Sequence, residues 1–538
     1  MNLLNEVCDK KKGTRAKLVL LSLYHIQHLG ARYVHSILKA QGYPVELVFF
    51  KNMFLSDAEP ATPVEIDLLV DIIEDRRADV VGISLGCSTF LQLASHITKR
   101  IHDQLRMPVL WGGVHPTVCP EQCIAVADAI CVGEGEYPML ELMGGLSRGE
   151  EVSRIKNLWF RHDGSVIRNE IRNLVEDLDS LPFPDYANEG KYYIDGNSIA
   201  EGDPVHTHTW DYITTTSRGC PNRCAYCGNS TLHELYRGRG RYVRRRSAAN
   251  VIEELAHAKQ SISGVRTVAF LDDLFPTDAQ WVEEFCTRYR AEIGLPFWCY
   301  FHPRTVNEKT VRLLRSAGLS YADMGVQSGS ERVRNSVFFR PDSNQTVVEA
   351  VGILNRLRIL PRLDFILDNP FETEADKQET LSLLLELSRP FELNLFSLIN
   401  FPGTALTRRA LNEGLITEQE VEDKKRKILD QWRVTLNSTR SKEELFWIAL
   451  FLLTGRRFIP RRFIRFLANR PTIKSHPAAL VILAVAVRYV QAGVRGVRLL
   501  FTGRLTRVVL QRNLRFLRRE TSTRKPSALP LTNYEYPE

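Results

Sequence analysis

The chain has 538 residues, of which 44% are apolar and 25% charged, and its formal net charge is +8. This length and apolar content exclude a disordered or fibrous protein and indicate about three or four globular domains. Ten cysteines, together with the lack of a secretory leader at residues 1–12, lead us to expect a reducing, cytoplasmic environment.

Residues 1–145 alternate short apolar strands with amphipathic helices. We expect strands at 17–23, 45–50, 80–84, 109–111 and 129–132, and helices at 31–41, 66–74, 91–105 and 121–126. This pattern predicts a flavodoxin-like α/β domain with a doubly wound parallel sheet. Such sheets bind ligands at the carboxyl ends of their strands.

Glycine-rich segments follow three of these strands, and glycines let a large flat ligand approach the backbone. The segments are Ser84-Leu85-Gly86, Gly112-Gly113-Val114-His115-Pro116-Thr117 and Gly133-Glu134-Gly135-Glu136. The candidate ligand-binding residues are Ser84, Gly112, Gly113, His115, Glu134 and Gly135. For His115, a turn residue with a hydrogen-bonded ring is the alternative. The nearby Cys119, Cys123 and Cys131 fit no standard metal signature and are expected to be structural thiols.

Residues 146–205 are expected to form a connector with a hairpin around 162–164 and a proline-rich stretch at 181–184. Strand–helix alternation resumes in residues 206–430. Six strands are predicted at 212–216, 267–271, 298–301, 322–326, 362–367 and 394–398. Six such units with right-handed crossovers predict an open, partial barrel, whose site lies at the C-terminal face.

Three cysteines lie close together after the first of these strands. The segment is Ser217-Arg218-Gly219-Cys220-Pro221-Asn222-Arg223-Cys224-Ala225-Tyr226-Cys227-Gly228. A zinc site usually needs a second cysteine pair, which the sequence does not offer. The thiolates of Cys220, Cys224 and Cys227 can instead hold three irons of a [4Fe–4S] cluster and leave the fourth iron free for a small molecule.

The Cys-x3-Cys-x2-Cys spacing, with the aromatic Tyr226 before its last cysteine, resembles the signature of radical S-adenosylmethionine (radical SAM) enzymes. In that family the open iron binds S-adenosylmethionine (SAM), and one electron from the cluster gives a 5′-deoxyadenosyl radical. The resemblance implies a [4Fe–4S] cluster and SAM as cofactors. It also implies a low-potential electron donor of the flavodoxin or ferredoxin type.

The glycine-rich loops, followed by the cysteine triplet, resemble the cobalamin-binding domain of cobalamin-dependent radical SAM enzymes, so cobalamin is the third expected cofactor. Many cobalamin proteins supply a lower axial histidine from an Asp-x-His-x-x-Gly motif, which is absent here. In the nearest candidate, residues 25–30, His25 replaces the Asp and Gln27 replaces the His. We therefore expect cobalamin without a protein histidine on its lower face.

The same resemblance assigns roles to residues that follow the barrel strands. Asp272 or Asp273 lies where the family holds the methionyl ammonium, with a helix N-cap as the alternative for either. Arg304 is placed to meet the methionyl carboxylate or, alternatively, solvent.

The segment 325–331 resembles the family's Gly-x-Glu-Ser-Gly-Ser sequence near the ribose, which makes Gln327, Ser328 and Glu331 candidates. Gln327 replaces the family's usual Glu, and its amide can still hydrogen-bond a hydroxyl. The loop 368–373 is expected to face the substrate or the adenine.

The region 431–538 is expected to be basic and mostly helical, with a disordered end after residue 521. Residues 446–519 contain sixteen Arg and Lys and no Asp or Glu, and the apolar run 477–487 is too short to span a bilayer. Arginines beside apolar faces favour peripheral contact with an anionic membrane surface. Pairing with the acidic rest of the chain is the alternative. Nucleic-acid binding is disfavoured because no RNA-binding module accompanies the charge.

The sequence therefore predicts a cobalamin-dependent radical SAM methyltransferase that acts at an unactivated carbon of a small, hydrophobic or lipid-like substrate. In such relatives one SAM methylates cobalamin and a second generates the radical. The alternatives are a cyclase or rearrangement enzyme without methyl transfer, and a non-catalytic iron–sulfur or cobalamin sensor. A methylthiotransferase is disfavoured because the remaining cysteines do not clearly supply a second ligand triplet.

Overall fold

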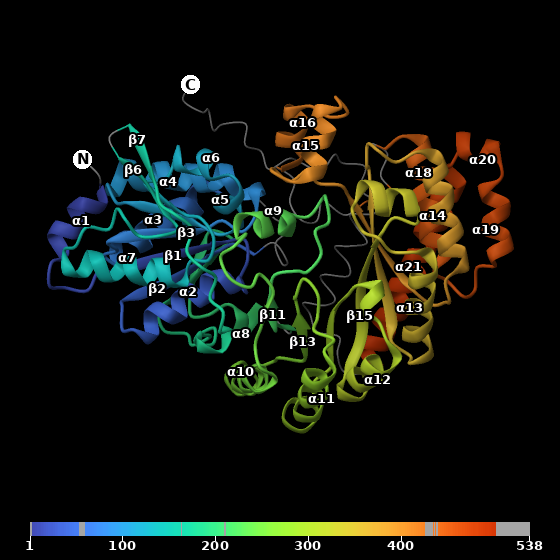
Figure 1. The fold of residues 1–538 in the computed structure, drawn as a ribbon, viewed down its shortest axis with the longest axis horizontal. Helices are drawn as coiled ribbons and strands as arrows, with labels where there is room; N and C mark the ends of the chain where they lie inside the picture. The colour runs from blue at the N-terminus through green and yellow to red at the C-terminus, as the bar shows by residue number, and fades with distance from the viewer. Residues whose placement is uncertain are drawn as a thin grey trace.

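The computed structural model describes residues 3–52, 60–162, 164–208, 211–425, 434, 436 and 440–501. Figure 1 shows two halves side by side: an N-terminal half built around one sheet and a second half built around a curved sheet. Helix α9 (Gly228–Leu235), which follows the cysteine triplet, lies between them.

The N-terminal sheet has nine strands in the order β7-β6-β5-β4-β3-β1-β2-β8-β9. Its predicted strands are confirmed within one residue at each end. They are β1 (Leu18–Leu23), β2 (Val45–Phe50), β3 (Val80–Ser84), β4 (Val109–Gly112) and β5 (Ala129–Cys131). All five run parallel. The carboxyl ends of the strands therefore meet at one edge, as a doubly wound fold requires.

Helices cover both faces of this sheet (Figure 1). One face packs against α1 (Leu3–Lys11), α2 (Leu29–Ala40) and α7 (Glu136–Arg148). The other face packs against α3 (Pro63–Asp75), α4 (Leu91–Leu105) and α6 (Pro120–Ile124). The central strands β1 and β3 are buried along their whole length, which explains why their sequences are apolar except for Ser22 and Ser84.

The segment expected to be a connector instead extends both edges of the same sheet. The hairpin of β6 (Leu158–His162) and β7 (Ser165–Arg168), predicted around residue 162, pairs with β5. Strands β8 (Lys191–Asp195) and β9 (Ser198–Glu201) pair beyond β2. Because β9 is exposed throughout, it lacks the apolar pattern that marks a buried strand.

The second half is the predicted open barrel, with six parallel strands in chain order. The strands are β10 (Asp211–Thr214), β13 (Thr267–Phe270), β14 (Phe297–Phe301), β15 (Leu319–Gln327), β16 (Leu360–Leu367) and β17 (Glu392–Ser397). A short antiparallel ribbon of β11 (Ser217–Arg218) and β12 (Arg244–Arg245) flanks the cysteine loop.

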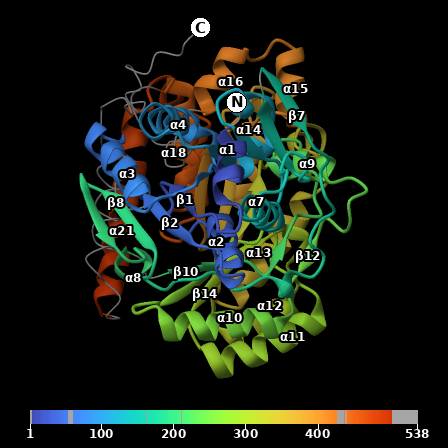
Figure 2. The ribbon, with the colours of Figure 1, turned by 90° about the vertical axis from the view of Figure 1, so that its left-hand side faces the viewer.

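Five helices follow these strands around the outside of the barrel: α10 (Ala248–Ser261), α11 (Ala279–Arg288), α12 (Glu308–Ala317), α13 (Asn344–Arg356) and α14 (Glu374–Glu386). Figure 2, with the N-terminal half toward the viewer, shows α10, α11 and α12 grouped below it. Shorter helices lie in connections: α5 (Val114–Val118), α8 (Val205–His208), α15 (Ala405–Asn412) and α16 (Glu418–Lys425).

The described C-terminal region is helical, as predicted, and its helices are α18 (Lys442–Thr454), α19 (Arg461–Ala468), α20 (Pro471–Ser475) and α21 (Ala478–Phe501). Helix α18 is buried in the same hydrophobic core as the barrel. Among the described residues, none of the helices has the combined length and apolarity that a bilayer crossing requires. The end expected to be disordered lies outside the described residues.

Candidate active site

Backbone hydrogen bonds hold the cysteine loop to the barrel through both the N–H and the carbonyl of Ala225. The backbone N–H of Ala225 donates to the Phe338 carbonyl at 2.9 Å, and the Leu406 N–H donates to the Ala225 carbonyl at 2.9 Å. Cys227 is the N-cap residue of α9. The loop therefore holds its three cysteines on a backbone fixed by hydrogen bonds to distant segments.

The thiols have hydrogen-bond donors around them. The Asn222 amide lies 3.8 Å from the Cys220 sulfur, and the Arg340 guanidinium lies 3.7 Å from the Cys224 sulfur. Burial raises the pKa of the Cys227 thiol to about 11, whereas binding to iron would favour the thiolate. Donors to sulfur stabilise thiolate ligands and tune the cluster potential.

The donor set fits a cluster rather than a single ion. Across the described ranges, no three His, Cys, Asp or Glu side chains are arranged to hold one metal ion. A [4Fe–4S] cluster does not need such convergence, because each thiolate binds a different iron. Three thiols on one fastened loop with a cation beside them match that requirement.

The two neighbouring carboxylates after β13 have different surroundings. Asp272 accepts hydrogen bonds from the Thr216 N–H and hydroxyl, both at 2.9 Å, and from the Ser217 hydroxyl at 2.5 Å. Burial raises its pKa to about 6. Asp273 instead accepts from the Asn229 amide at 2.8 Å, in the first turn of α9. The helix that follows is capped by Asp278, so neither carboxylate is its N-cap.

Arg304 reaches the cysteine loop from the loop after β14. Its guanidinium contacts Asp342 at 3.0 Å and the Asn222 side-chain oxygen at 3.4 Å. The side chain remains 46% exposed, so the guanidinium keeps donors available for a ligand.

The three candidate residues at and after the end of β15 have different surroundings. Gln327 lies at an irregularity in the pairing of β15 and β16, with φ of +73°, and its side chain lines a pocket. Ser328 is buried and accepts from the Ser330 N–H at 3.2 Å. Glu331 accepts from the Asn344 N–H at 2.6 Å, at the start of α13, so it is bound to the outer helix.

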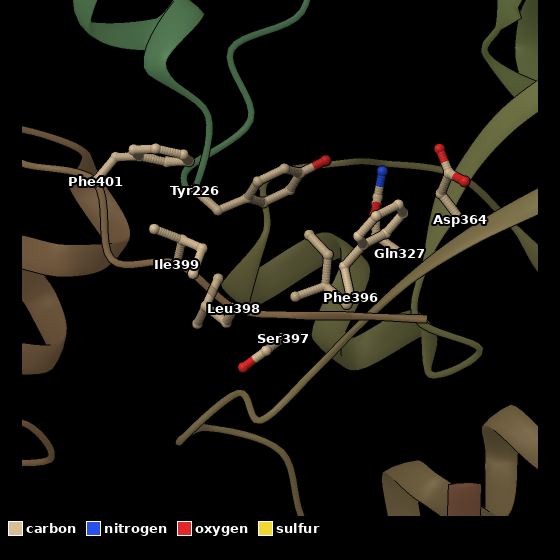
Figure 3. Close-up of a pocket in the computed structure, with 9 residues that line it drawn as sticks. Tyr226, Gln327, Asp364, Phe396, Ser397, Leu398, Ile399 and Phe401 are labelled. Carbon is tan, nitrogen blue, oxygen red and sulfur yellow. The ribbon is translucent and has the colours of Figure 1, made fainter. Parts of the chain in front are cut away.

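The pocket at the barrel mouth encloses about 190 Å³ and is mostly apolar (Figure 3). Its lining residues are Tyr226, Gln327, Asp364, Ile366, Phe396, Ser397, Leu398, Ile399 and Phe401. In Figure 3 the Tyr226 ring projects toward the Gln327 side of the pocket. This places the aromatic residue of the cysteine signature in the wall of the pocket.

A buried amide lies between the lining residues Ile399 and Phe401 in the sequence, although it is not itself part of the pocket lining. Asn400 is 1% exposed, and neither its side-chain oxygen nor its nitrogen has a hydrogen-bond partner in the structure. Leaving such an amide unsatisfied costs about 1–3 kcal/mol per group. Because adenine presents both a donor and acceptors, an adenosyl group is a suitable partner.

Glycines lie at the carboxyl edge of the N-terminal sheet, where a flat cofactor would approach. Gly113 has φ of +104°, and a Cβ there would lie 2.9 Å from the Leu85 carbonyl oxygen. A Cβ on Gly86 would lie 2.5 Å from the His28 ring nitrogen Nε2. Gly112 is open, with no neighbour closer than 3.7 Å. Gly113 and Gly86 are thus required by packing against Leu85 and His28 within the domain, and the open Gly112 fits the close backbone approach that cobalamin needs.

The polar candidates at this edge are bound within it. The Ser84 hydroxyl lies 3.4 Å from the His28 ring nitrogen Nδ1, and His115 is fully buried with its Nδ1 2.8 Å from the Ser88 hydroxyl. His115 thus has the hydrogen-bonded ring of the alternative interpretation.

Glu134 points to the barrel rather than to the glycine-rich edge, and its neighbour Gly135 is the N-cap of α7. Its carboxylate contacts Arg244 at 2.7 Å and Arg218 at 3.2 Å. Burial opposes ionisation, but the two arginines outweigh it and hold the pKa of Glu134 below its usual value.

Four residues to which the sequence analysis assigned no contact between the domains join the two halves. They are Gln27, Arg218, Tyr236 and Arg244. The Gln27 amide donates to the Asp211 carbonyl at 3.0 Å and accepts from the Ile213 N–H at 3.1 Å, which pairs it with the free edge of β10. Arg218 lies two residues before Cys220, and that proximity was the available signal.

A doubly wound domain whose binding edge is joined to a barrel carrying a three-cysteine loop defines a cobalamin-binding radical SAM architecture. The B12 binding domain family matches residues 16–143, and the Radical SAM superfamily matches residues 214–384. The chain belongs to the radical SAM enzymes that carry an N-terminal B12-binding domain. Its cofactors are cobalamin, a [4Fe–4S] cluster and SAM.

Relatives share this organisation. An uncharacterized methyltransferase of Pyrococcus horikoshii is 26% identical over 71% of this chain and 82% of its own length. The anaerobic magnesium-protoporphyrin IX monomethyl ester cyclase of Synechocystis is 22% identical over 73% of this chain and 81% of its own.

Two solved structures share the fold. The radical SAM methyltransferase TsrM of Kitasatospora setae, with cobalamin and a [4Fe–4S] cluster bound, has a TM-score of 0.58 at 16% identity and covers 74% of this chain and 78% of its own. The cobalamin-dependent SAM radical enzyme OxsB has a TM-score of 0.56 at 19% identity, and the match covers 76% of this chain and 56% of the OxsB chain.

Proposed function

We propose that this protein is a cobalamin-dependent radical SAM methyltransferase that methylates an unactivated carbon of a small hydrophobic molecule. The observation that carries the proposal is the union of the two sites. The B12-binding domain is joined to the first strand of the barrel through Gln27, and to the segments that flank the cysteine loop through Glu134 and Tyr236. Methyl transfer between cofactors requires such proximity.

Several of the candidate residues have a task that their surroundings support. Cys220, Cys224 and Cys227 are the cluster ligands. Asp273 and Arg304 both contact side chains of the cysteine-loop region and offer opposite charges for the methionyl ammonium and carboxylate. Asp272 anchors the backbone that enters the loop.

Tyr226, Asn400 and Gln327 belong to the mouth of the barrel, where the adenosyl group would bind. When bound, the cofactors supply an adenosyl radical that removes a hydrogen atom and a methyl group that replaces it. The apolar walls of the pocket, formed by residues such as Phe396 and Leu398, exclude water from the radical.

A cyclase that uses the same cofactors is the second candidate, and the similarity to the Synechocystis cyclase is the observation that favours it. A low-potential flavodoxin or ferredoxin is the proposed electron donor in either case. The two reactions differ in the fate of the methyl group of SAM.

We expect cells that carry the gene and are fed methionine with a trideuterated methyl group to accumulate a metabolite containing three deuterium atoms. Mass spectrometry of extracts with the gene, without it, and with alanine at all three signature cysteines provides the comparison. A gene-dependent product that carries no label would refute methyl transfer and support the cyclase.

We also propose a peripheral contact with anionic membranes through a surface on α19 and the turn before it. This surface exposes three phenylalanines, Phe458, Phe463 and Phe466. Exposed arginines surround them: Arg457, Arg461, Arg462, Arg465 and Arg470. Interfacial helices combine aromatic and basic residues in this way.

Part of the basic charge is used internally. The Arg461 guanidinium donates to the Leu387 carbonyl at the end of α14 at 2.6 Å, and Lys474 pairs with Glu374. Arg462 and Arg465 remain exposed on the outer face of α19. The membrane contact therefore rests on these two arginines and the phenylalanines beside them.

Replacing Arg462 and Arg465 by Gln is expected to reduce binding to anionic liposomes about tenfold at low salt, because each cation near such a surface contributes about 1 kcal/mol before screening. Sedimentation with anionic and neutral liposomes measures the effect. The matched control is Lys309→Gln/Arg315→Gln, on exposed positions of α12. If the wild-type protein stays in the supernatant with anionic liposomes, the membrane contact is wrong.

A further inference from the structure

An ionic cluster at the boundary of the two halves contains two acids from the B12-binding domain and two arginines from the barrel. Glu134 contacts Arg244 through both carboxylate oxygens, at 2.7 and 3.0 Å, and Arg218 at 3.2 Å. Glu136 contacts Arg218 at 2.7 Å. Arg244 is only 4% exposed and Glu136 only 6%.

The two arginines belong to the ribbon that leads into the cysteine loop. Arg218 and Arg244 are directly paired across β11 and β12. Gly219 follows with φ of +85°, and a Cβ there would collide with the Tyr242 carbonyl oxygen. The chain then continues to Cys220, so the position of β11 sets where the loop begins.

A third contact reaches the same acidic segment from the other end of the cysteine loop. The Tyr236 hydroxyl, directly after α9, accepts a hydrogen bond from the Glu134 N–H at 2.8 Å. A side chain on Gly133 would collide with that hydroxyl, and Gly133 has φ of +99°. Residues 133–136 therefore hold both ends of the segment that contains the three cysteines.

Burying charged groups at such an interface carries a free-energy cost of desolvation. Buried ion pairs rarely add net stability over well-packed apolar side chains, because desolvation offsets their attraction. What a two-point carboxylate–guanidinium pair adds is a defined orientation. Radical chemistry needs a defined orientation of the reacting groups, since a displacement of about 1 Å can lower the rate about a hundredfold.

We infer that Glu134 is a positioning residue that fixes the cysteine loop relative to the B12-binding domain through Arg218 and Arg244. This inference rests on the proposed cluster site. It replaces the cofactor-binding role expected for Glu134 from the sequence, and it gives the glycine-rich segment 133–136 a task in the barrel rather than at its own sheet edge.

The test compares Glu134→Gln with Glu121→Gln, which removes an exposed two-point pair with Arg168 within the same domain. In cofactor-free protein, amide hydrogen exchange across residues 214–236 is expected to be about tenfold faster in Glu134→Gln than in the control. Exchange in β1 and β3 is expected to match that of the control, because the two cores of the B12-binding domain lie away from the ionic cluster. In a separate measurement on protein loaded with cobalamin, retention of cobalamin is expected to match that of the control as well.

A spectroscopic measurement completes the test. In cluster-loaded protein, Glu134→Gln is expected to broaden the electron paramagnetic resonance (EPR) signal of the reduced cluster, while Glu134→Asp keeps the charge and restores part of the wild-type line shape. The double variant Glu134→Gln/Arg244→Gln removes the unpaired charge. It is expected to recover thermal stability while the loop still exchanges fast.

Equal exchange in Glu134→Gln and Glu121→Gln, with unchanged cluster spectra, would overturn the positioning role. Fast loop exchange that the double variant fully reverses would also overturn it, because the effect would then be that of an unpaired buried charge. If wild-type protein holds no cluster at all, the proposed function fails, while the exchange comparison still decides the role of Glu134.

Discussion

Protein in which Cys220, Cys224 and Cys227 are all replaced by Ala is expected to lack the brown chromophore after anaerobic reconstitution and to form no 5′-deoxyadenosine from SAM. The loss should be complete, since the other seven cysteines are dispersed through both halves. Iron and sulfide content, together with chromatography of the SAM products, measure the two effects.

The variant should still fold. The two cores of the B12-binding domain contain no residue of the loop, and the barrel core lies between its strands and helices. The matched control is Cys119→Ala, a partly exposed cysteine outside the loop, which should keep both the chromophore and the product. A triple variant that retains an intact cluster would rule out these three cysteines as its ligands.

The buried strands of both halves could be predicted because burial leaves a strong pattern of apolar residues in the sequence. Most of the buried positions in β1, β3 and β16 are apolar. The edge strand β9 could not, because it is short and exposed, so its sequence resembles that of a loop. The extent of the N-terminal sheet therefore emerges only from pairing in space.

The cysteine loop could be predicted because its ligands are close together in the sequence. The ionic cluster of Glu134 could not be predicted. Its partners Arg218 and Arg244 follow 84 and 110 residues later. A glycine-rich segment after a strand predicts a backbone approach, but it carries no information on whether a ligand or a tyrosine from another domain makes that approach. Here Tyr236 does.

The adjacent carboxylates Asp272 and Asp273 show a similar limit. Neighbouring residues at a strand end face opposite sides, so one enters the barrel wall and the other faces α9. Which one does so depends on the register of β13 against β10, which tertiary pairing fixes. The pair could therefore be predicted from the sequence, whereas the different surroundings of the two carboxylates appear only in the structure.

Gln27 explains part of what the sequence left open about cobalamin. It occupies the place of the histidine in the Asp-x-His-x-x-Gly motif, and its amide is hydrogen-bonded to Asp211 and Ile213 of the barrel. The side chain that would reach the lower face of cobalamin in motif-bearing proteins is thus committed to joining the two halves.

The union of a cobalamin site and a cluster loop in one chain is tested most directly by EPR of wild-type protein reconstituted anaerobically with iron, sulfide and cobalamin. We predict one cobalamin and one cluster per chain, and a cob(II)alamin spectrum without nitrogen superhyperfine splitting from a protein imidazole. Splitting from a histidine would contradict the free lower face. Failure to retain cobalamin would contradict the joint site itself.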